Sequence, residues 1–185
     1  MNSPLAATAP QATFKPAGVR ETVVLLAVAW LVPFAVHLAP WSGERPLGAH
    51  LLPMFWATLV AAYLFGARLG VVVGLFAPVV NLLFTGLPAW KFLSVLSVEL
   101  TIFALFVAAG ARRWPRFWAL APLAYLAAKT VTTALQAAVG IFGDIGAPLA
   151  FFAQSVVGGA AGLVVLLGLH AALVRLYPKT ATPAA

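Results

Sequence analysis

The sequence predicts an all-α membrane protein, a bundle of six transmembrane helices with both termini in the cytoplasm. Of 185 residues, 63% are hydrophobic and only 8% are charged, about a third of the charged fraction usual in a soluble domain. The mean hydropathy is +1.03. The apolar residues form long runs, and the basic residues fall in the short segments between them.

A helix needs roughly 20 apolar residues to cross the hydrocarbon core of a bilayer. Apolar runs bounded by Pro, Gly and charged residues give six such helices, over 22–39, 51–66, 69–86, 90–110, 117–140 and 149–175. We expect a disordered cytoplasmic tail over 1–20, rich in Ala, Pro and Thr, and a single six-helix transmembrane domain over 21–177. Residues 178–185 form a C-terminal tail.

The basic residues orient the bundle. With six crossings, Arg45 and Lys91 lie on one side of the membrane, beside Glu44 and Asp144. The other side carries Lys15, Arg20, Arg68, Arg112, Arg113, Arg116, Arg175 and Lys179. Cytoplasmic loops carry the excess of Lys and Arg, so the second side is predicted to be cytoplasmic.

One carboxylate lies near the middle of the run "KFLSVLSVELTIFALFVAAG", residues 91–110. An isolated anion at that depth costs a few kcal/mol or more, so Glu99 needs a partner, a ligand or both. Lys129 lies at a similar depth on the next helix, which runs antiparallel. The two charges are therefore expected to pair, either as a purely structural ion pair or as the floor of a binding pocket.

Three large amides, Asn81, Gln136 and Gln154, all fall in the outer half of the predicted membrane. Gln136 also shares one face of its helix with Lys129 and with Thr132 or Thr133. Polar residues along one side of a membrane helix must face protein or water. Each amide alone fits an interhelical hydrogen bond. Together they favour a cavity that opens outward.

Further candidates for contact with a solute lie near the outer loops. His50 opens the second helix beside the long outer loop, and Trp90 starts the fourth. Trp90 fits either an interfacial anchor or a platform on which a flat ligand stacks. His170, near the cytoplasmic end of the last helix, is assigned to the membrane interface. The small-residue pairs Gly70–Gly74 and Gly158–Gly162 predict close helix contacts, mostly within the bundle.

Several classes of function are excluded or disfavoured. The chain has no cysteine, so disulfides, thiolate metal sites and cysteine nucleophiles are excluded. No HExxH, G-x-S-x-G or Walker A motif is present, and three scattered histidines with four acids do not build a metal site. We therefore expect no enzyme, no metal and no cofactor. The net charge of +7 reflects membrane topology, and nucleic acid is not an expected partner.

Residues 46–110 resemble the membrane S components of energy-coupling factor (ECF) vitamin transporters. In one branch of that family Leu-Leu-Pro-Met opens the second helix, a tight turn ends in Gly-x-(Lys/Arg), and the third helix runs through Pro to Leu-x-Thr-Gly-Met-Pro. The fourth helix carries a central Glu-Leu. The matching positions here are Leu51, Leu52, Pro53, Met54, Gly66, Pro78, Thr85, Gly86, Pro88, Glu99 and Leu100.

The resemblance implies a substrate-capture subunit of an ATP-driven importer in the bacterial or archaeal cytoplasmic membrane. Its ligand is a vitamin or vitamin precursor bound near the outer face, and its partners are a coupling transmembrane subunit and two ATPase subunits. Relatives of this branch often have an arginine where Lys129 stands, so here a compact ammonium group replaces a planar guanidinium group.

Two alternatives stay open. The chain fits a six-helix structural or scaffolding protein in which Glu99 and Lys129 are purely architectural. It also fits a solitary secondary transporter with Glu99 as a proton site, although no internal inverted repeat is evident.

Overall fold

The structure is a computed structural model of the chain and describes residues 18–43, 47–86, 90–140 and 147–179. All regular secondary structure in these ranges is α-helical, as predicted. The helices are α1 (Val19–Leu38), α2 (Leu47–Leu51), α3 (Pro53–Phe65), α4 (Ala67–Thr85), α5 (Trp90–Arg113), α6 (Leu120–Val139), α7 (Pro148–Gly158) and α8 (Ala160–Leu176). The helix α1 begins two residues before the expected start of the membrane domain.

Four helical stretches are long and apolar enough to cross a membrane, or five if α7 and α8 form one broken span. The four are α1, α2 with α3, α4 and α5. These spans are consistent with a multi-pass integral membrane protein. The helix α6 is not among them, because Lys129, three threonines and Gln136 interrupt its apolar sequence.

Two of the expected single helices are broken. The segment predicted over 51–66 begins at Leu47 and is interrupted at Leu52, which has a left-handed backbone (φ 55°) immediately before Pro53. Proline lacks an N–H group and disfavours a helical residue before it, which explains this break. The segment predicted over 149–175 bends by 60° between α7 and α8 at Gly159.

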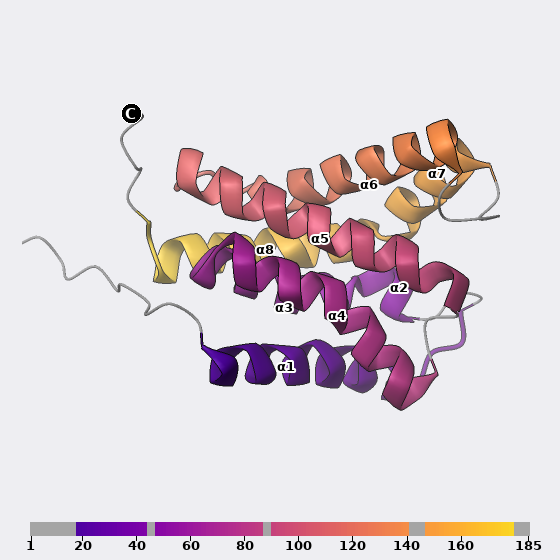
Figure 1. Ribbon diagram of the computed structural model, residues 1–185, viewed down its shortest axis with the longest axis horizontal. Helices are drawn as coiled ribbons and strands as arrows, with labels where there is room; N and C mark the ends of the chain where they lie inside the picture. Colours follow the sequence, from indigo (N-terminus) through magenta and orange to yellow (C-terminus); the bar gives the residue numbers. More distant parts are fainter. Residues whose placement is uncertain (1–17, 44–46, 87–89, 141–146, 180–185) are drawn as a thin grey trace, which may run out of the picture.

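The helices lie side by side, with α1 and α6 at opposite edges of the view in Figure 1. The start of α1 and the end of α8 lie at the same end of the bundle (Figure 1). The Tyr63 hydroxyl at the end of α3 donates to the Tyr177 carbonyl (2.9 Å), and Lys179 covers the Tyr63 ring. We call this the arginine-rich end, because Arg68, Arg112, Arg113 and Arg175 occupy helix ends there.

Small residues bring the helix backbones together. A Cβ added to Gly74 on α4 would lie 2.8 Å from the Leu100 carbonyl oxygen on α5. At Gly70 an added Cβ would lie 2.8 Å from the Ala62 side chain. The predicted Gly70–Gly74 contact surface is therefore confirmed as internal packing of α4 against α3 and α5. Gly162 likewise packs against Leu51.

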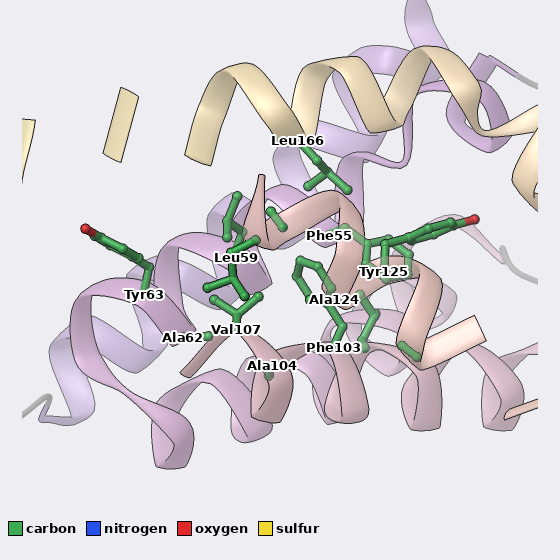
Figure 2. Packing of buried hydrophobic residues seen from close by; sticks show 14 of the residues in the cluster. Phe55, Leu59, Ala62, Tyr63, Phe103, Ala104, Val107, Ala124, Tyr125 and Leu166 are labelled. Atoms are coloured by element: carbon green, nitrogen blue, oxygen red, sulfur yellow. The ribbon is translucent and has the colours of Figure 1, made fainter. Parts of the chain in front are cut away.

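The main hydrophobic core joins α3, α5, α6 and α8. Phe55 packs edge-to-face on both Phe103 and Tyr125, with ring centroids 5.1 Å apart in each pair. Figure 2 shows Tyr63 and Tyr125 at opposite ends of this core, each hydroxyl pointing away from it. A second cluster joins α1, α3 and α4 through residues including Leu25, Ala29 and Val73. The core fixes α5 against α6, and this contact positions the candidate site.

Candidate functional site

The ion pair expected from the sequence is present. Lys129 Nζ on α6 lies 2.8 Å from Glu99 Oε2 on α5. Both residues are buried, with 1% of Glu99 and 7% of Lys129 exposed. Moving two charges out of water costs free energy. Their mutual attraction offsets this cost only when the geometry is good and further hydrogen bonds are made, so the neighbouring groups decide whether this pair is stable.

Thr132 supplies a hydrogen bond to the carboxylate. Its Oγ1 donates to Glu99 Oε1 at 3.2 Å and also lies 3.0 Å from the Ala128 carbonyl oxygen. Because a hydroxyl has one proton, Thr132 can donate to only one of these two oxygens at a time. The sequence left Thr132 and Thr133 as equal candidates for the polar face. The structure buries Thr132 and leaves Thr133 half-buried.

Two aromatic rings surround the lysine. Lys129 Nζ lies 5.9 Å from the Tyr125 ring centroid and 5.0 Å from that of Phe151. Both distances are within the range of cation–π attraction, which strengthens when the cation is desolvated. Tyr125, four residues before Lys129 on the same helix, could have been found from that spacing. Phe151 could not, because it belongs to a distant apolar helix.

The helix α7 covers the lysine loosely. Phe151 lies on α7, and no residue of this helix is buried. The Tyr125 hydroxyl donates to the Ser155 carbonyl at 3.3 Å and so ties α7 to α6. The cover of the ion pair is therefore a short, partly exposed helix that ends at a 60° bend.

His50 lies beside this bend. Its Nδ1 is 2.8 Å from the Gly158 carbonyl oxygen, and its ring centroid is 5.6 Å from that of Trp41. Because a carbonyl only accepts, Nδ1 is the protonated nitrogen in this contact. His50 thus joins the break between α2 and α3 to the bend between α7 and α8.

The remaining candidates are dispersed. Asn81 is buried on α4, beyond Gly74 toward the opposite end from the arginines. Gln136 is half-buried, and its position seven residues after Lys129 places it about 10 Å further along α6. Gln154 is exposed on α7. The Trp90 side chain lies outside the described part of the structure.

The arrangement has a defined chemical capacity. Glu99 can accept hydrogen bonds and Lys129 can donate them, so a small solute carrying both donors and acceptors could replace part of their mutual contact. No group of three or more His, Asp or Glu residues within the described ranges could hold a metal ion.

No protein-family model matches the chain, and neither a curated protein nor a solved structure matches it. Its function is therefore inferred from the site and from the local resemblance of residues 46–110.

Proposed function

We propose that this chain is the substrate-capture subunit, the S component, of an ECF-type importer that takes up a small vitamin-like micronutrient. A coupling transmembrane subunit and two ATPases would supply the energy, since the chain has no nucleotide-binding motif of its own. The proposal places it in the cytoplasmic membrane of a bacterium or archaeon. It combines the resemblance of residues 46–110 with the chemistry of the site.

The observation that carries the proposal is the buried Glu99–Lys129 pair beneath Phe151. A charged pair of this kind is often no more stable than apolar side chains of the same volume, so its presence calls for a reason besides stability. Charged residues within membrane segments commonly mark solute or ion paths. Here Phe151 covers Lys129, and Phe151 belongs to α7, a helix without a fully buried residue.

In this proposal the chain crosses the membrane six times, and α2 with α3 and α7 with α8 each form one broken crossing. The helix α6 crosses with its polar face turned inward, since Lys129 and Thr132 are both buried. Both termini are cytoplasmic. The common location of the start of α1 and the end of α8 supports an even number of crossings, and the charge distribution supports the orientation.

Solute entry requires α7 to move, because Glu99 and Lys129 are otherwise closed off. We place the hinge at Gly159, between α7 and α8. Outward movement of α7 removes Phe151 from Lys129 and frees one side of the ammonium. A solute anion or carbonyl then replaces the aromatic ring, while solute N–H groups bind Glu99 in place of the Thr132 hydroxyl.

The scaffolding and secondary-transporter alternatives make different predictions for the same preparation. The decisive experiment purifies the tagged chain from its native membranes and identifies what accompanies it. An S component brings down a coupling subunit and two ATPases, and uptake stops when the ATPases lose the Walker lysine. Uptake without ATPases would support a solitary transporter. If neither partner subunits nor solute binding were found, the scaffolding alternative would be supported.

Solute identity is tested by melting the detergent-solubilised chain against a panel of water-soluble vitamins and precursors. A ligand that raises the melting temperature of the wild type, and of the control T130V, should have no effect on E99Q/K129M. Thr130 is an exposed neighbour whose hydroxyl bonds its own helix, at the Leu126 carbonyl. An equal shift in the double variant would refute the assignment of the site.

A further inference from the structure

A second feature lies at the arginine-rich end, on the outer surface of α5 and α6. A groove of about 420 Å³ runs between these helices. Small residues, including Ala109 and Ala127, line it together with Phe106 and Leu123. Arg113 and Trp114 lie at the end where α5 stops. The Arg113 end of the groove lies away from the ion pair, because Arg113 is fourteen residues, or about 21 Å of helix, from Glu99.

The groove exposes large apolar side chains along its length. Phe106 is 41% exposed, Leu123 is 49% exposed and Trp114 is 59% exposed. In a membrane Phe106 and Leu123 face acyl chains. From Phe106 to Arg113 the helix rises by about 10 Å, so the groove joins an apolar interior to a charged mouth.

The mouth of the groove is basic. Arg113 lines it, and Arg112 and Arg116 are exposed within three residues of Arg113 in the sequence. No Asp or Glu occurs between residues 100 and 143. At the same end of the bundle, the Glu21 carboxylate accepts from its own backbone neighbour, Gly18 N, at 2.8 Å. Within the described ranges the two carboxylates, Glu21 and Glu99, thus bond groups other than these arginines, which leaves the arginines open to an external anion.

From this combination we infer that the groove binds one anionic glycerophospholipid. The phosphodiester group contacts Arg113 and its basic neighbours, and one acyl chain lies along Ala109 and Phe106. Arginine suits this ligand because its planar guanidinium matches two phosphate oxygens at once. Trp114 occupies the level of the glycerol backbone, where its amphipathic ring is favoured. A zwitterionic lipid such as phosphatidylcholine would fill the apolar part equally well and carries the same phosphodiester, but its cationic choline group offsets the attraction to the arginines.

The test measures lipid retention by native mass spectrometry of the full chain in a neutral detergent. Phosphatidylglycerol and phosphatidylcholine with identical acyl chains are added at matched concentrations. We expect a single phosphatidylglycerol to be retained at least tenfold more strongly. Replacing Arg113 with Gln should lower that retention about fivefold, the usual effect of one basic residue near an anionic surface.

Two further variants separate the groove from general surface charge. A109W fills the groove and should abolish retention while leaving the arginines in place. R175Q removes an exposed arginine from α8 at the same end of the bundle and should leave retention unchanged. The inference is overturned by equal retention of the two lipids, by an R175Q effect as large as that of R113Q, or by full retention in A109W. Competition by millimolar inorganic phosphate would also overturn it, since that result would indicate a phosphate site without a role for the acyl chain.

Discussion

Phe151 on α7 covers the ammonium group of Lys129 on α6, with Nζ 5.0 Å from the ring centroid. The ammonium thus contacts both a carboxylate and an aromatic ring. The carboxylate belongs to a helix fixed in the core, whereas the aromatic ring belongs to a helix without a buried residue. Four predictions follow from this asymmetry and from the charge distribution.

Removal of one member of the ion pair should be much worse than removal of both. E99Q or K129M alone leaves a buried charge without its partner and should destabilise the fold by about 3–5 kcal/mol. The double variant E99Q/K129M should recover most of this loss, yet should not bind solute. Melting temperature and solute binding are measured for all three. A double variant with wild-type binding would show that the pair is architectural.

Thr132 should matter more than its neighbour Thr130. T132V keeps the shape of the side chain and removes a hydrogen bond to a charged carboxylate, at a cost of about 1.5–3 kcal/mol. T130V removes an exposed hydroxyl and should change stability by less than about 0.5 kcal/mol. Chemical denaturation in detergent compares the two. Equal losses of stability in the two variants would mean that the Thr132 hydroxyl bonds its own helix and does not stabilise the Glu99 carboxylate.

Phe151 should control access to the site. F151A removes the aromatic cover and a cation–π contact worth about 0.5–2 kcal/mol, so both association and dissociation of solute should accelerate. V157A, on the same helix at 76% exposure, serves as the control and should leave both rates unchanged. Stopped-flow binding provides the rates. If F151A slows association, the ring would be part of the solute site instead of its cover.

Single-cysteine labelling tests the orientation of the bundle in the membrane. Because the chain has no native cysteine, only the introduced one can react. A membrane-impermeant maleimide added to intact cells should modify D144C and spare R113C. Permeabilised cells should show modification at both positions, which establishes that each cysteine is reactive. The opposite pattern in intact cells would reverse the bundle and place the α5–α6 groove in the outer leaflet.

The all-helical fold and the central ion pair were predictable because both follow from local constraints. A polar backbone in lipid must satisfy its own hydrogen bonds, so long apolar runs become helices. Two opposite charges at equal depth on consecutive helices are expected to pair with each other. The Gly70–Gly74 contact followed in the same way, since small side chains at this spacing let two backbones approach closely.

The dispersion of the outer amides was less predictable. Asn81 is buried while Gln154 is exposed, although both lie in the same predicted depth band. His170 is 1% exposed and bonds the Trp118 carbonyl oxygen at 2.9 Å through Nδ1, so its side chain faces the bundle. Depth along a helix can be read from sequence, but the direction of a side chain depends on how that helix is rotated in the bundle.

By itself the sequence determined that the chain is helical and apolar enough for a membrane, that Glu99 needs a partner, and which end of the bundle is basic. Only the tertiary structure decided that Thr132 is the residue that contacts Glu99, that Phe151 covers Lys129, and that the last helix bends at Gly159. The physical reason is the range of the interactions. Hydropathy and helix periodicity act within one segment, whereas a cover and a hinge depend on contacts between segments far apart in the chain.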